Sequence, residues 1–247
     1  MKRFTQNGVI LVVGVIAALA AVNGVYLNFV KPSLQVPLLV AAGMLLLLGG
    51  YGMWTDRRES AQDDEHLADS HEPGPDAGHG HDHERGPRVG WLLVVPFLLL
   101  GVVAPPPLGA FSAAEDSGLI GITTIEGLPP LADGDPLDLT LAEFQGRALA
   151  DPAQSLTGRR VRLTGFASAG RIPGAWVLTR MSLNCCAADG FAVKVAVDGV
   201  PPLADDEWVQ VVGTWRPAPL VSLEEQELPV LEVEELTRIE APENSYE

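Results

Sequence analysis

The chain has 247 residues, a formal net charge of −16 and a hydrophobic content of 47%. Its acidic surplus argues against nucleic-acid binding, because negative side chains repel phosphate instead of releasing its counterions. The apolar residues are concentrated in three segments without a charged side chain, 5–30, 32–55 and 89–114. Each segment is long enough to contain a membrane-spanning helix, so we expect an integral protein of the lipid bilayer.

Residues 1–55 are predicted to form two transmembrane helices, centred on 9–27 and 36–54. Both segments are rich in Leu, Val, Ile and Ala, and Tyr26 and Trp54 stand at their ends, where aromatic rings suit the headgroup region. The basic pair at residues 2–3 resembles the start of a signal peptide. The apolar run that follows is too long for one and a second run comes directly after it, so we expect this helix to be retained.

Residues 91–111 are predicted to form a third transmembrane segment. The apolar run 91–104 is only 14 residues long and is followed by three prolines, which cannot continue a helix. A short core helix or a re-entrant segment is therefore the alternative. Basic residues flank the N-terminus and the linker after Trp54, whereas Lys31 is the only one between the first two helices. The positive-inside rule then predicts a multi-pass protein of the cell membrane, with a cytoplasmic N-terminus and linker and an extracytoplasmic C-terminal domain.

Residues 56–90 are predicted to form a disordered linker. They include ten acidic and four basic side chains, no aromatic residue and all five histidines of the protein, a composition that cannot bury a core. His79, His81 and His83 occupy alternate positions, and such imidazoles in a flexible acidic chain can bind a divalent cation such as Zn²⁺. The spacing matches no defined zinc motif, so a solvated linker is the other interpretation.

The remaining residues are predicted to form a connecting segment with a short helix, 112–158, and an all-β domain, 159–247. Alternating apolar residues predict strands at 160–167, 175–181, 191–197, 207–215 and 228–239. Five short strands suit a small closed barrel that resembles the OB-fold, and a small β-sandwich is the alternative. Many OB-folds bind nucleic acid, but residues 105–247 carry 22 acidic and nine basic side chains, so we expect no such ligand here.

Cys185 and Cys186 are the only cysteines, and they are adjacent. Neighbouring Cα atoms lie about 3.8 Å apart, too close for the pair to cross-link distant elements as an ordinary disulfide does. Three interpretations remain open. The two side chains pack as small apolar groups, they form a strained vicinal disulfide with redox activity, or they bind a metal as thiolates.

Asp189 follows the cysteines closely and offers a third ligand. Two thiolates and a carboxylate would suit zinc or another divalent or soft metal ion, with an open position for water or a partner. Successive side chains of a strand face opposite sides, so both sulfurs reach one ion only if the chain turns at 184–190. Arg180 lies on the other side of the cysteines, and we expect it to pair with Asp189 and hold this loop.

No catalytic motif accompanies these residues. The chain contains no Gly-rich phosphate loop, no Ser/His/Asp set and no His-Glu helix motif, and a cysteine nucleophile would lack a histidine base in its own domain. We therefore do not expect an enzyme.

The arrangement resembles the YcgQ-like proteins, the small subunits of two-component membrane permease complexes. The matching features are the paired N-terminal apolar segments, the histidine-rich acidic linker, and the motifs Val103-Ala104-Pro105-Pro106-Pro107-Leu108-Gly109, Gly165-Phe166, Cys185-Cys186-Ala187-Ala188-Asp189 after Arg180, Trp208-Val209-x-Val211-x-Gly213 and Ile239-x-x-Pro242-x-x-x-Tyr246. In that family a proline usually precedes the tyrosine, where this chain has Ser245.

The resemblance implies a polytopic permease subunit as the partner, but it does not name a cargo. We therefore expect an accessory subunit whose extracytoplasmic β domain handles a metal ion or a small solute. The alternative is a free-standing membrane-tethered protein with metal-binding or thiol-redox activity.

Overall fold

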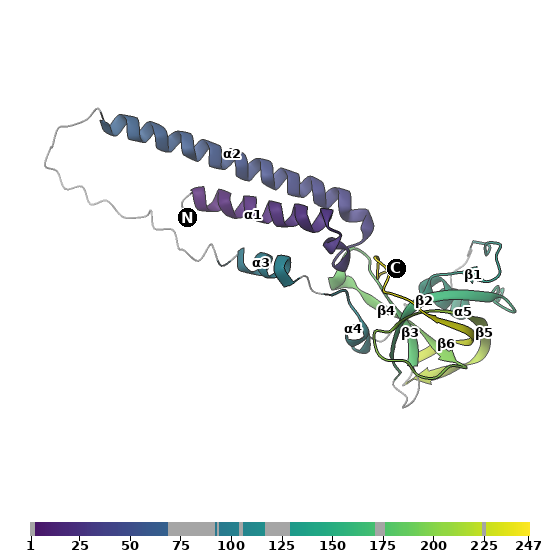
Figure 1. The fold of residues 1–247 in the computed structure, drawn as a ribbon. Coiled ribbons are helices and arrows are strands. Elements are labelled where there is room, and N and C mark those ends of the chain that lie inside the picture. Colours follow the sequence, from purple (N-terminus) through teal and green to yellow (C-terminus); the bar gives the residue numbers. More distant parts are fainter. Residues whose placement is uncertain are drawn as a thin grey trace. The chain divides into compact units, whose positions relative to one another are not determined.

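The computed structural model describes residues 3–68, 92, 94–103, 106–116, 129–170, 176–223 and 226–247. They divide into two compact units, and Figure 1 shows the helices and strands of both. The first unit consists of Met1–Tyr26 and Ser33–Pro105, and the second of Leu27–Pro32 and Pro106–Glu247. The short connection between the first two helices therefore belongs to the C-terminal unit.

The first unit contains the helices α1 (Arg3–Val22), α2 (Gln35–Ala68) and α3 (Val94–Val103). Two stretches, Thr5–Val22 and Pro32–Arg58, have mean hydropathies of 2.0 and 1.9 over lengths of 18 and 27 residues. In the described part of the chain, these two are long and apolar enough to cross a membrane. Both apolar helices that the sequence predicts at the N-terminus are therefore present, and they are compatible with membrane association.

The helices α1 and α2 pack directly against each other as an antiparallel pair (Figure 1). A Cβ atom on Gly49 would lie 3.0 Å from the backbone nitrogen of Leu11, so a larger side chain there would separate the helices. Small residues allow this close approach in membrane helix pairs. At the far end of the pair, Asn7 Nδ2 donates a hydrogen bond of 2.9 Å to Asp56 Oδ2.

The helix α2 continues to Ala68, so the prediction of a disordered linker from residue 56 is wrong for residues 56–68. This stretch is rich in Arg, Glu, Gln, Ala and Leu, which have high helix propensity. A helix that has already formed extends through such residues without a new nucleation step. His79, His81 and His83 lie outside the described residues.

The predicted third transmembrane segment, 91–111, is not one continuous helix. Its helix α3 has 10 residues, which reach about 15 Å, and residues 106–109 are not helical. A separate short helix, α4 (Ala110–Ala114), follows in the C-terminal unit. The prolines at 105–107 explain the interruption, since proline lacks the backbone donor that a helix needs.

The C-terminal unit contains a closed five-stranded barrel. Its strands are β2 (Arg160–Ala169), β3 (Trp176–Ser182), β4 (Phe191–Asp198), β5 (Trp208–Leu223) and β6 (Gln226–Arg238). They pair in the order β2-β3-β4-β6-β5, and β2 also pairs with β5 to close the barrel. Only β4 and β6 run parallel within it. This is the strand order of the OB-fold, so the barrel prediction is confirmed and the sandwich alternative is wrong.

A two-residue strand, β1 (Leu137–Asp138), adds to β2 in parallel, outside the barrel. Within β2, residues up to Phe166 pair with β5 and residues from Phe166 onward pair with β3. Gly165 lies at this change of partner, where a Cβ atom would lie 2.6 Å from the carbonyl oxygen of Thr179. Glycine is required there because two backbones approach each other closely.

The helix α5 (Leu141–Ala150) packs against the barrel and completes its core. Thr140 caps the helix by accepting the Glu143 N–H at 3.0 Å. Leu141 and Phe144 are fully buried against the apolar interior of the strands. A second cluster, which includes Phe166, Met181, Leu183 and Tyr246, joins α4 to β3 and to the C-terminal tail.

Phe144→Ala is expected to lower the free energy of unfolding of the C-terminal unit by about 3–5 kcal/mol, because it leaves a cavity in a closed core. The matched control is Phe111→Ala, since Phe111 is 85% exposed and its change is expected to stay within about 0.5 kcal/mol. Denaturant titration followed by tryptophan fluorescence measures both. Equal losses for the two variants would contradict the assigned core.

Candidate functional site

The loop between β3 and β4 is organised around the carboxylate of Asp189. Its Oδ1 atom accepts the backbone N–H groups of Asn184 at 2.9 Å and Cys186 at 3.3 Å, and its Oδ2 atom accepts that of Cys185 at 2.9 Å. The chain then forms a single 3-10 turn, Ala187–Asp189. The turn that the sequence requires at residues 184–190 is therefore present, and one side chain holds it.

This turn brings the three predicted metal ligands together. The Sγ atoms of Cys185 and Cys186 lie 3.6 Å apart as free thiols, well beyond the ~2.05 Å of a disulfide bond. The two sulfurs and a carboxylate oxygen of Asp189 all lie within 4.8 Å of one another. Cys185 is exposed and the other two are half-buried, so solvent or a partner can reach the cluster.

The spacing of the sulfurs suits tetrahedral coordination. With an ion about 2.3 Å from each sulfur, the sulfur–metal–sulfur angle would be about 100°, close to the tetrahedral value that zinc adopts. A linear two-sulfur arrangement with the same bond length would need a separation of about 4.6 Å, and the observed separation is 3.6 Å. The spacing of the two sulfurs therefore suits a tetrahedral ion, and Asp189 lies near enough to offer a third ligand.

Cys185 and Asp189 shift each other's pKa in opposite directions. The hydrogen bond to the Asp189 carboxylate, and a further one to Cys186, raise the pKa of the Cys185 thiol to about 12. The same hydrogen bond, together with the backbone N–H groups of the loop, lowers the pKa of Asp189. At neutral pH Cys185 is thus a thiol and a weak nucleophile, because the thiolate is the reactive form. A bound cation would replace this proton, since coordinated thiols deprotonate.

The predicted ion pair between Arg180 and Asp189 is wrong. Arg180 donates to the carbonyl oxygens of Asn244 at 2.8 Å and Thr164 at 3.3 Å, and its guanidinium lies 5.3 Å from the centre of the Trp208 ring. Burial lowers the pKa of Arg180. Asp189 is surrounded by backbone N–H groups instead, so Arg180 fixes the C-terminal tail and not the cysteine loop.

A segment from the other end of the chain forms part of the site, and the sequence did not indicate it. Val30 forms an antiparallel bridge with Cys186. Ala187 N–H donates to Phe29 O at 2.7 Å, and Lys31 N–H donates to Cys185 O at 3.3 Å. Leu27–Pro32 therefore pairs with the cysteine loop through backbone hydrogen bonds. Six residues between two apolar helices carry no pattern from which such a distant contact can be inferred.

The C-terminal tail joins this segment to the barrel through Tyr246. Its hydroxyl donates to Asn28 O at 2.8 Å and accepts the Leu108 N–H at 2.9 Å. Tyr246 is 2% exposed and forms a bridge with Met181 of β3. Tyr246 thus connects β3 through its backbone with the segment Leu27–Pro32 and the chain that follows the prolines through its hydroxyl.

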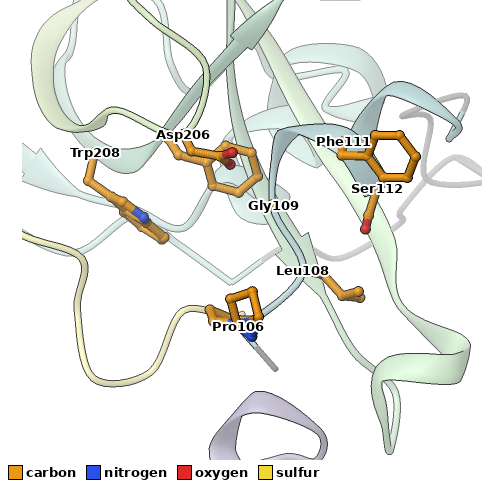
Figure 2. A pocket seen from close by; sticks show the side chains of 9 residues that line it. Pro106, Leu108, Gly109, Phe111, Ser112, Asp206 and Trp208 are labelled. Carbon is orange, nitrogen blue, oxygen red and sulfur yellow. The ribbon is translucent and has the colours of Figure 1, made fainter. Parts of the chain in front are cut away.

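A separate hollow lies beside α4 and encloses about 480 Å³. Figure 2 shows Trp208 and Phe111 on either side of it, with Asp206 and Gly109 between them. The lining is mostly apolar, and its one carboxylate, Asp206, accepts the Ala110 N–H at 2.6 Å. The size is that of a small-molecule pocket, but convergent polar groups are not part of its lining. The hollow therefore offers apolar contact and no set of reactive groups.

The chain combines two apolar helices, which are compatible with membrane association, with an OB-like barrel that carries two adjacent free thiols. Residues 147–247 match the family model of the DUF1980 C-terminal domain. The match begins within α5 and includes the barrel, the cysteine loop and the tail, whereas α1, α2 and Leu27–Pro32 lie outside it. Neither the curated proteins nor the solved structures include a match to this chain. The domain part of the family resemblance is thereby supported.

Asp189→Asn is expected to speed the alkylation of Cys185 in the metal-free protein. If the pKa of Cys185 falls from about 12 toward its usual value near 9, the thiolate fraction at pH 8 rises about 1,000-fold, and lower intrinsic nucleophilicity reduces the gain in rate to about 30-fold. Iodoacetamide labelling with tandem mass spectrometry separates Cys185 from Cys186. Asp198→Asn is the control, because its carboxylate binds Arg216 instead. An unchanged rate in Asp189→Asn would contradict the effect of Asp189 on the pKa of Cys185.

Proposed function

We propose that the protein is the membrane-anchored accessory subunit of a two-component permease complex, and that its barrel binds Zn²⁺ on the extracytoplasmic side. The observation that carries the proposal is the cluster of Cys185, Cys186 and Asp189, whose ligand atoms lie within 4.8 Å of one another. The cluster belongs to a domain that is tethered to apolar helices.

The ligand set favours zinc over a hard cation. Thiolates select soft and borderline ions, whereas Mg²⁺ and Ca²⁺ prefer oxygen ligands. Structural zinc sites usually have four protein ligands, while a site with three keeps a position for an exchangeable group. The exposure of Cys185 leaves that position open to water, to a solute or to a ligand from the partner. An open site suits an ion that is passed on, which is what an accessory subunit of a transporter requires.

Chain connectivity supports an extracytoplasmic barrel. Leu27–Pro32 belongs to the C-terminal unit, so if α1 and α2 cross the bilayer, the barrel lies on the side of their connection. That connection has Lys31 as its only basic residue, whereas basic residues gather at residues 2–3 and 57–58. The positive-inside rule assigns the side with fewer basic residues to the exterior. The chain must then return through the uncharged stretch around α3, which would make three crossings.

The described helix pair encloses no route for an ion, which supports a separate partner subunit. The described helices α1 and α2 pack directly through glycines, and two closely packed apolar helices enclose no polar path for an ion. Transport would therefore need a polytopic subunit. The match of residues 147–247 to the DUF1980 C-terminal domain, the paired apolar helices and the motif of the tail agree with the resemblance to permease small subunits.

A free-standing membrane-tethered zinc protein is the second candidate, because one chain supplies all three ligands. The thiol-redox form of this alternative is less favoured. The sulfurs are 3.6 Å apart and the pKa of Cys185 is raised, which slows attack on a disulfide. Whether a partner accompanies the protein separates the two candidates.

Purification of the tagged protein in mild detergent at native expression is expected to recover one polytopic protein in a fixed ratio and about one zinc per chain. Mass spectrometry identifies the partner, and elemental analysis counts the zinc. Cys185→Ser/Cys186→Ser is expected to lose the zinc, because Ser does not replace a thiolate ligand, whereas Asp198→Asn is expected to retain it. A protein that elutes alone would contradict the subunit assignment. Zinc that is still bound after the double substitution would contradict the proposed site.

The topology predicts opposite labelling of two introduced cysteines in a Cys185→Ser/Cys186→Ser background. Glu235→Cys, at a side chain that is 69% exposed on the barrel, is expected to react with a membrane-impermeant maleimide in intact cells. Ser60→Cys, which follows the apolar part of α2, is expected to react only after permeabilisation. Protection of Glu235→Cys in intact cells would reject the extracytoplasmic barrel.

A further inference from the structure

The backbone of the cysteine loop is bonded on two sides. On one side, the N–H groups of Cys185 and Cys186 point to the carboxylate of Asp189. On the other side, Cys185 O accepts the Lys31 N–H at 3.3 Å and Ala187 N–H donates to Phe29 O at 2.7 Å. The peptide group between Cys185 and Cys186 is therefore shared: its N–H faces Asp189 and its carbonyl oxygen holds Leu27–Pro32. Through this shared peptide group, a change in the order of one side can affect the order of the other.

The segment Leu27–Pro32 lies in the connection between the two apolar helices. The helix α1 ends at Val22 and α2 begins at Gln35, and most of the residues between them form short 3-10 turns, Val25–Asn28 and Pro32–Leu34. The C-terminal tail also holds the segment, because the hydroxyl of Tyr246 donates to Asn28 O at 2.8 Å.

The metal-competent form of the loop is the form in which the segment is docked. With Leu27–Pro32 in place, the sulfurs are already separated by 3.6 Å, as a tetrahedral ion needs. Metal bonds would restrict the motion of residues 185–189 further. The backbone groups that bind the segment would then stay in place for more of the time. Two events that favour the same conformation stabilise each other, and the coupling is reciprocal.

We propose that Zn²⁺ bound by Cys185, Cys186 and Asp189 locks Leu27–Pro32 onto the barrel and thereby communicates the occupancy of the site to α1 and α2. This inference rests on the zinc site of the proposed function. A subunit built in this way would present its partner with a different helix pair before and after it has captured an ion. The permease could then respond to a loaded subunit without contacting the metal.

The first test is hydrogen exchange of the full chain in detergent, with and without one equivalent of Zn²⁺. Zinc is expected to slow the exchange of the Lys31 and Ala187 amides about tenfold or more, because opening of the segment would then require release of the ordered loop. A segment that docks for structural reasons alone would show the same exchange in both states.

The second test is the reciprocal effect on zinc affinity. Tyr246→Phe keeps the buried ring but removes the hydrogen bond that holds Asn28, and it is expected to weaken zinc binding about 2- to 10-fold. Ser245→Ala is the matched control, because it removes a neighbouring hydroxyl that binds Pro242 O and not the segment. Competition with a zinc chelator measures both dissociation constants.

The outcomes separate this inference from the proposed function. Stoichiometric zinc with an unchanged Lys31 amide, or with equal affinities in Tyr246→Phe and Ser245→Ala, would overturn the coupling and leave the zinc site in place. An absence of zinc binding would overturn the site, and the coupling with it. Slower Lys31 exchange together with weaker binding in Tyr246→Phe alone would establish the coupling.

Discussion

The carboxylate of Asp189 is the group on which the candidate site depends. It accepts the N–H groups of the residues before it and so turns the chain back at the end of β3. It also raises the pKa of the Cys185 thiol, which keeps that thiol protonated and a weak nucleophile at neutral pH. One side chain thus sets both the geometry of the two sulfurs and their protonation. A loop with the same cysteines and no such acceptor would leave the sulfurs on opposite faces of a strand.

The acidic surface of the C-terminal unit adds a weaker and less selective effect. Residues 105–247 carry 22 acidic and nine basic side chains, and several arginines are already occupied by exposed carboxylates, such as Arg160 with Glu234 at 2.8 Å. The remaining negative charge raises the local concentration of cations. Carboxylates attract all divalent ions alike, whereas thiolates discriminate among them. The surface would therefore gather cations and the cysteine loop would select among them.

Local patterns in the sequence predicted most of the architecture. The absence of charge marked α1 and α2, alternation marked the barrel strands, and the adjacency of Cys185 and Cys186 with Asp189 nearby marked the site. The patterns failed where distant or neighbouring structure decides the outcome. Residues 56–68 are polar but extend a helix that is already formed, and Arg180 finds carbonyl acceptors in the tail. The docking of Leu27–Pro32 depends on residues more than 150 positions away, and no local signal encodes it.

The phenol of Tyr246 imposes an order on the biosynthesis of the protein. Its two hydrogen bonds connect residues that are 218 and 138 positions apart in the chain. The apolar helices emerge from the ribosome long before residue 246, so the segment between them is still undocked when they form. The junction beside the cysteine loop closes only when the tail has been made and has paired with β3. The site is thus completed last, after both apolar helices and the barrel strands have been made.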